Sequence, residues 1–140
     1  MFSGLRVRVC LCLSIIVSGL ALRGFGLGLR LPALFVKYGG SVLWGTMVFF
    51  RVAIAAPHLS RQSIALIAAA IAVYVELFRL LHTPWLDAFR LTLAGALLLG
   101  RIFSLSDMLA YGVGIVLGMW LDRFGMSLIT NARDASHSAS

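Results

Sequence analysis

Charged residues are scarce in this sequence of 140 residues. They make up 12% of the chain and only five of them are acidic, whereas hydrophobic residues make up 61% and the mean hydropathy is +0.99. A soluble globular domain is about one quarter charged and half apolar, and a chain this short can hide only a limited core from water. The composition therefore excludes a soluble domain, and its many Leu, Ile, Val and Phe residues exclude a disordered chain.

Patterns typical of metal sites and of common catalytic centres are also missing. The two cysteines, Cys10 and Cys12, lie in the first apolar run with no second pair and no ligand-like histidine nearby. We therefore expect packed or lipid-facing thiols, not a metal site or a disulfide. The chain has no zincin, nucleophile-elbow or Walker pattern. No metal and no cofactor is predicted, and the sequence leans away from an enzyme without deciding the question.

Basic residues outnumber acidic ones, which gives a formal net charge of +7. In a soluble chain this excess would suggest nucleic-acid binding. Here the basic residues stand singly between apolar runs, a pattern typical of anchors to anionic lipid headgroups. The predicted partner is the lipid bilayer, and no nucleic acid is expected.

The apolar runs predict four membrane spans, since about 20 residues cross a bilayer. They cover about 7–28, 38–56, 61–82 and 105–122, so the expected fold is an all-α, multi-pass transmembrane helical bundle in a single domain at 1–129. Because Arg6 and Arg8 precede the first run, a signal peptide is the alternative there. Arg51, about two-thirds along the second span, costs up to about 3 kcal/mol unless it snorkels or finds a partner.

Two segments do not fit a complete span. Residues 91–100 are apolar but too few to cross, so we predict a re-entrant or interfacial segment over 88–102. Residues 130–140 are polar and predict a disordered tail. Four spans place both termini on one side; Lys and Arg divide five against six between the two sides, and the first helix then favours cytoplasmic termini.

The few ionisable residues inside apolar segments are the candidate functional residues. Glu76, Arg79 and His82 follow at intervals of three, on roughly one face of the third helix. The connection after it adds a second acid and base, Asp87 and Arg90. Acids within membrane helices usually face the bundle interior and often mark function, although a structural ion pair is the alternative.

A stripe on the fourth helix contributes the other candidates. Asp107, Tyr111, Gly114 and Gly118 stand at offsets of four, seven and eleven, and so share one helix face. Asp107 fits an N-terminal helix cap as well as a site. The two glycines form a small-xxx-small pattern, for which packing against a helix of the same chain is favoured over dimerisation.

Four motifs occur in order: KYGGSVLW at 37–44, ExxR at 76–79, HxPWLDxxR at 82–90 and SDxxAYxxG at 106–114. Together they resemble the small bacterial integral membrane proteins known as domain of unknown function 2809, over roughly residues 31–121. They are similar, more distantly, to the VanZ-like family, which is linked to glycopeptide resistance. The resemblance implies a multi-pass protein of the bacterial inner membrane and envelope, and assigns no activity. Where that family usually has Gln, this chain has Arg79, which can neutralise Glu76.

The hypothesis that follows is binding of an anionic lipid headgroup or envelope precursor. Arginines would hold the phosphate and the acids would orient the arginines. An intramembrane enzyme acting on a lipid-linked substrate is one alternative, with Glu76 or Asp107 as general base and His82 assisting. A small transporter or accessory subunit is the other, and at this length transport would require an oligomer.

Overall fold

The computed structural model describes residues 2–26, 28–78, 81, 83–92 and 105–139, and these contain five helices and no strand. The helices are α1 (Phe2–Phe25), α2 (Ala33–Ala55), α3 (Arg61–Phe78), α4 (Pro84–Arg90) and α6 (Leu105–Ser138). All except α4 are long and apolar enough to cross a membrane. The predicted all-α, multi-pass helical bundle is confirmed, and the chain is a membrane protein.

Residues with restricted or unusual backbone geometry set the helix ends. The turn after α1 needs Gly26, since a Cβ there would lie 2.2 Å from the Leu22 carbonyl oxygen. Pro32 directly precedes α2, and Pro57 follows two residues after its end. At the start of α3, the Ser60 hydroxyl accepts a hydrogen bond from the Ser63 amide at 3.2 Å.

The first three spans differ from their predicted bounds by a few residues, and the fourth helix differs most. The predicted span at 105–122 is only the first half of α6, which continues to Ser138 through the predicted disordered tail. The segment after 122 has one glycine and no proline, and its side chains from Thr130 to Ala139 are exposed. Its polarity argues against burial but not against helix formation, and that distinction corrects the prediction.

The connection between α3 and α6 contains the short helix α4. Pro84 occupies the first turn of α4, where its missing N–H costs nothing. This helix includes residues 88–90, which were predicted to begin the re-entrant or interfacial segment. The remainder of that segment, from 93 on, lies outside the described residues.

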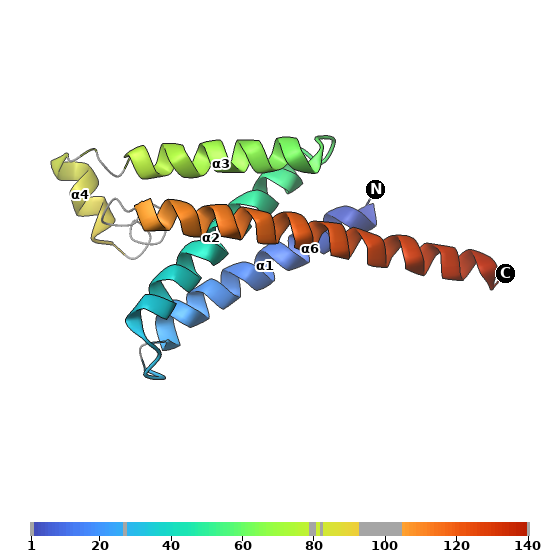
Figure 1. Ribbon diagram of the computed structural model, residues 1–140, viewed down its shortest axis with the longest axis horizontal. Helices are drawn as coiled ribbons and strands as arrows, with labels where there is room; N and C mark the ends of the chain where they lie inside the picture. The colour runs from blue at the N-terminus through green and yellow to red at the C-terminus, as the bar shows by residue number, and fades with distance from the viewer. Residues whose placement is uncertain (1, 27, 79–80, 82, 93–104, 140) are drawn as a thin grey trace.

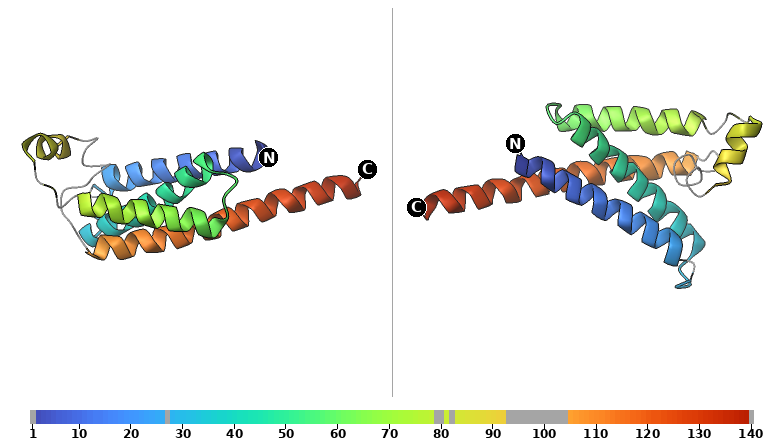
Figure 2. Two further views of the ribbon diagram at one scale, coloured as in Figure 1. Left: turned by 90° about the horizontal axis from the view of Figure 1, so that it is seen from above. Right: turned by 180° about the vertical axis from the view of Figure 1, so that it is seen from behind.

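Helix α2 is the centre of the bundle and packs against α1, α3 and α6. Figure 1 shows α3 and α6 side by side and antiparallel, with α1 and α2 crossing them. Both views of Figure 2 place the two chain termini toward the same end of the molecule, with the last part of α6 projecting beyond the bundle. The ends of α1 and α3, the start of α6 and the short α4 lie toward the opposite end (Figure 1).

Large apolar side chains fill the core, and small residues allow the helices to pack closely. Phe49, Phe50 and Ile64 are fully buried, and the two phenylalanine rings meet edge to face at 5.5 Å. Where α2 and α6 meet, a Cβ on Gly114 would lie 2.1 Å from the Val42 carbonyl oxygen, and one on Gly118 would contact Phe49 at 2.8 Å. Both glycines therefore serve contact between helices of the same chain.

Candidate functional site

Glu76 lies near the end of α3 and is fully buried. It follows Ala69 and Ala72 at helical spacing, so these three residues share the face of α3 that turns toward the bundle interior. The helical spacing of α3 thus places one acid, Glu76, on the face that packs into the bundle. Arg79 and His82, predicted to join Glu76, lie outside the described residues.

Asp107 and Tyr111 occupy the first turns of α6, where this helix passes α2. Asp107 is 7% exposed and its Oδ1 accepts a hydrogen bond from the Ser41 hydroxyl of α2 at 3.3 Å. Tyr111 is 3% exposed, and its ring lies 4.7 Å from that of Trp44, centroid to centroid. The predicted stripe on α6 is therefore the face that packs into the bundle, and it carries a second buried acid.

Arg90 joins α4 to the end of α3. Its guanidinium donates from Nη2 to the Phe78 carbonyl oxygen at 2.8 Å, and from Nη1 to Leu81 O at 2.9 Å and to Asp87 Oδ1 at 3.2 Å. These carbonyls belong to the last turn of α3 and its exit, where helical partners run out. Among the described residues, two buried donors at this junction, Arg90 Nε and the Thr83 hydroxyl, have no hydrogen-bond partner.

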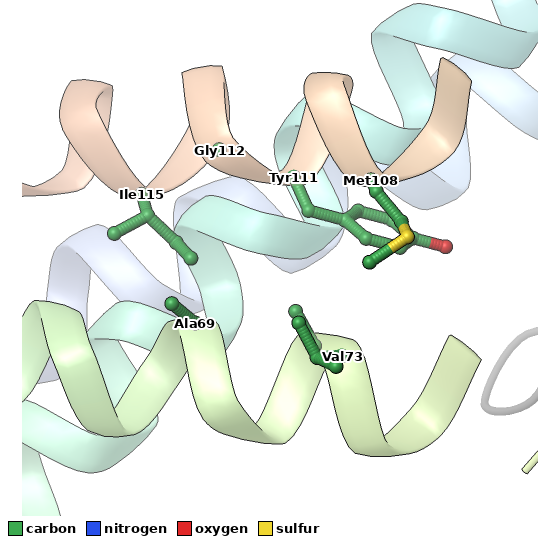
Figure 3. Close-up of a pocket in the computed structure, with 7 residues that line it drawn as sticks. Ala69, Val73, Met108, Tyr111, Gly112 and Ile115 are labelled. Atoms are coloured by element: carbon green, nitrogen blue, oxygen red, sulfur yellow. The ribbon is translucent and has the colours of Figure 1, made fainter. Parts of the chain in front are cut away.

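An apolar cavity of about 90 Å³ lies between α3 and α6. Figure 3 shows Ala69 facing Ile115 at one end, and Val73 facing Met108 and Tyr111 at the other. In the lining, Ala72 precedes Glu76 by one helical turn and Met108 directly follows Asp107. We call this space the α3–α6 cavity; its lining comprises Ala69, Ala72, Val73, Met108, Tyr111, Gly112 and Ile115.

A second polar group lies toward the other end of the bundle and was not predicted from the sequence. Asp122 of α6 accepts hydrogen bonds from Arg8 of α1, at 2.7 and 3.2 Å, and from Arg61 of α3, at 2.8 Å. Arg8 also donates to the Ala53 carbonyl oxygen of α2 at 3.0 Å. We call Arg8, Arg61 and Asp122 the arginine–aspartate cluster; it connects all four long helices.

A signal for this cluster was present in the spacing. Asp122 stands four residues after Gly118, so it continues the stripe of Asp107, Tyr111, Gly114 and Gly118 along the buried face of α6. The sequence interpretation treated it as the end of the fourth span. Arg8 and Arg61 were interpreted as anchors beside headgroups, because sequence spacing does not show which helices are neighbours.

The two polar groups differ in what they can do chemically. In the arginine–aspartate cluster, both carboxylate oxygens of Asp122 are engaged and its side chain is 1% exposed, so the cluster serves structure. At the other end, buried Glu76 and Asp107 lie within one helical turn of residues that line the α3–α6 cavity. The junction of α3 and α4 adds two buried donors without a partner among the described residues. Within the described residues, no group of three or more His, Cys, Asp or Glu side chains is placed to hold a metal ion.

The family of the chain follows from its sequence. A family model described as "Protein of unknown function (DUF2809)" matches residues 30–115, more than half of the chain. No solved structure matches the chain. The matched region begins before α2 and ends within α6, and it includes Glu76, Asp107 and the whole lining of the α3–α6 cavity. The chain belongs to the DUF2809 family, as its motifs predicted.

Proposed function

We propose that this protein binds an anionic lipid, with an apolar chain in the α3–α6 cavity and a phosphate-bearing headgroup at the adjoining end of the bundle. The observation that carries the proposal is the position of the cavity, whose lining includes Ala72, one helical turn before buried Glu76, and Met108, the residue after buried Asp107. Apolar lining beside convergent polar groups is the usual make-up of a ligand site.

The small lining residues explain why this position accepts a chain. Ala69, Ala72 and Gly112 leave the space that larger side chains would fill. A volume of about 90 Å³ accommodates roughly three groups the size of a water molecule, at ~30 Å³ each. A few methylene groups of a lipid chain therefore suit it, whereas a whole headgroup does not.

The junction of α3 and α4 explains the preference for an anion. Arg90 Nε and the Thr83 hydroxyl are buried donors without a partner among the described residues, and a buried donor without a bond is costly. A phosphate oxygen could accept from both donors, and guanidinium–phosphate hydrogen bonds are among the stronger ones in proteins. Asp87, 3.2 Å from Arg90 Nη1, would hold the guanidinium in position.

Native mass spectrometry of the purified chain in mild detergent tests this proposal. Two probes separate the lipid sources: phosphatidylglycerol for the bilayer, and a polyprenyl phosphate for lipid-linked envelope precursors. Phosphatidylcholine supplies the neutral comparison. We expect one or both anionic lipids to remain bound where phosphatidylcholine does not; equal retention of all three would contradict the proposal.

Two neighbouring alanines supply matched variants. Ala69→Leu places three more carbon atoms into the cavity and should weaken retention of the anionic lipid. Ala70→Leu makes the same change on the exposed face of the same helix and should not. Unchanged retention by both variants would exclude the cavity. Release of a chemically changed lipid would indicate an enzyme instead of a binding protein.

A further inference from the structure

A second cavity opens between α1 and α2, toward the end of the bundle that holds the chain termini. It is an open groove of about 410 Å³ on the outside of the helix pair. In a bilayer, this surface meets lipid chains. We call it the α1–α2 groove; its lining comprises Val9, Cys12, Leu13, Arg51, Ile54 and Ala55.

Arg51 is the charged member of this otherwise apolar lining. Its side chain is exposed, and among the described residues no carboxylate or carbonyl oxygen accepts a hydrogen bond from it. Arg8 and Arg61 lie toward the same end of the bundle but are occupied by Asp122. The arginine–aspartate cluster therefore does not provide Arg51 with a counter-charge.

Arg51 lies close enough to the end of α2 for its long side chain to reach the level of the lipid phosphates. It precedes Ala55, the last residue of α2, by four positions, or about 6 Å along the helix axis. The 23 residues of α2 span roughly 34 Å, slightly more than the ~30 Å hydrocarbon core. For a helix centred in the core and parallel to the bilayer normal, Arg51 would lie roughly 4 Å inside the core boundary, and its guanidinium could snorkel outward.

We propose that the α1–α2 groove binds an anionic phospholipid of the adjacent leaflet. The Arg51 guanidinium would donate hydrogen bonds to the phosphate, and one acyl chain would lie against Val9, Leu13 and Ile54. Arg6 is exposed and precedes Val9 by about one turn of α1, so it adds positive charge toward the same end of the bundle. Charge complementarity thus favours an anionic over a zwitterionic lipid.

A second copy of the chain fits the groove less well than a lipid. A two-fold dimer through this surface would bring two Arg51 side chains together in a medium of low dielectric constant. The repulsion between them would oppose association. A lipid phosphate instead neutralises the one charge that the groove contains.

The experiment titrates the full-length protein in mild detergent with phosphatidylglycerol or phosphatidylcholine and counts retained lipids by native mass spectrometry. The wild type should prefer phosphatidylglycerol. Arg51→Ala should weaken that binding about tenfold, as expected when a charge-assisted hydrogen bond is lost. Arg51→Lys should keep part of the preference because it keeps the charge. Arg123→Ala removes an exposed arginine elsewhere and should behave as the wild type.

Two results would overturn this proposal. Equal retention of phosphatidylglycerol by the wild type and Arg51→Ala would show that Arg51 binds no lipid phosphate. A species of twice the chain mass that disappears in Arg51→Ala would make the groove a contact between copies. The proposal is independent of the α3–α6 cavity: Ala69→Leu should leave the Arg51-dependent step unchanged, so the two failures are distinguishable.

Discussion

At the scale of single residues, the few acidic side chains differ in their bonding partners. Asp122 is bonded by two arginines from two other helices. Asp107 accepts a hydrogen bond from a serine, and Asp87 is 3.2 Å from Arg90. Burial is thus common to Asp107 and Asp122. Asp122 connects α6 with α1 and α3 through its two arginines, and Arg8 extends the connection to the Ala53 carbonyl oxygen of α2.

Replacing Asp122 should therefore destabilise the bundle more than replacing any exposed acid. In Asp122→Asn, two arginines lose their shared counter-charge, and Arg8 stays buried. Removing one partner of a buried ion pair costs about 3 kcal/mol or more. Thermal unfolding in mild detergent should show a clear fall in the midpoint temperature.

The matched control is Asp134→Asn, on the exposed part of α6. Surface substitutions usually change stability by less than about 0.5 kcal/mol, so its midpoint should equal that of the wild type. Equal midpoints for both variants would show that the cluster does not hold the helices together.

The sequence predicts single acids better than it predicts their partners. Helical spacing brings Asp107 to the buried face of α6, and the same spacing extended by one turn brings Asp122 there. Arg8 and Asp122, in contrast, are 114 positions apart. Their contact depends on how α1 crosses α6, which no local pattern in the chain specifies. The predicted roles of Arg79 and His82 stay predictions, as does the VanZ-like resemblance.

At the scale of elements, small residues decide how closely the helices approach. Gly45 and Gly114 lie where α2 meets α6, and a Cβ on either would come within 2.6 Å of a backbone oxygen of the other helix. Thr46 adds a hydrogen bond from its hydroxyl to the Gly114 carbonyl oxygen at 2.7 Å. Close backbone contact of this kind is typical of membrane helix pairs.

Adding a single methyl group at this contact should push α2 and α6 apart. Gly114→Ala would place its Cβ 2.1 Å from the Val42 carbonyl oxygen, so α2 or α6 must shift. Overpacking of this kind costs about 1–3 kcal/mol. We expect a lower midpoint of thermal unfolding in detergent for this variant.

Gly112→Ala makes the same change two residues away, where a Cβ would meet nothing within 4 Å. Alanine favours a helix over glycine by about 1 kcal/mol, so this variant should be as stable as the wild type or more so. A fall of equal size in both variants would mean that loss of glycine, and not the α2–α6 contact, causes the change.

Helix existence was predicted from apolar runs, but helix ends were not. The four runs gave the four spans, because length and hydropathy decide which segments cross a bilayer. The last part of α6, from Thr130 on, is polar and exposed, so hydropathy could not distinguish a helix there from a disordered tail. Likewise α4 has only seven residues, too few for a periodic signal.

At the scale of the whole molecule, the four candidate spans in the described part of the chain return both termini to the same end of the bundle. The turn after α1 and the short α4 lie at one end of the bundle, and both termini lie toward the other (Figure 2). We propose that this other end faces the cytoplasm of a bacterial inner membrane. The basic residues alone do not decide the orientation.

Labelling with a membrane-impermeant maleimide tests this topology. In a background with Cys10→Ser and Cys12→Ala, a single cysteine is introduced at Gly28 or at Ser138, both exposed. In intact cells, Gly28→Cys should react, whereas Ser138→Cys should react only after the membrane is opened. The reverse pattern would invert the orientation, and labelling of both in intact cells would contradict the four-span fold.

Stabilisation of the protein by added lipid gives the sharpest test of the proposed lipid in the α3–α6 cavity. The measurement is the rise in unfolding midpoint on adding the anionic lipid, made in the Arg51→Ala background so that the α1–α2 groove does not contribute. A ligand at about 100 times its Kd stabilises a protein by about 2.7 kcal/mol. We expect this rise with Ala69 intact and with Ala70→Leu, and its loss with Ala69→Leu. An equal rise in all three proteins would mean that no lipid binds in the cavity.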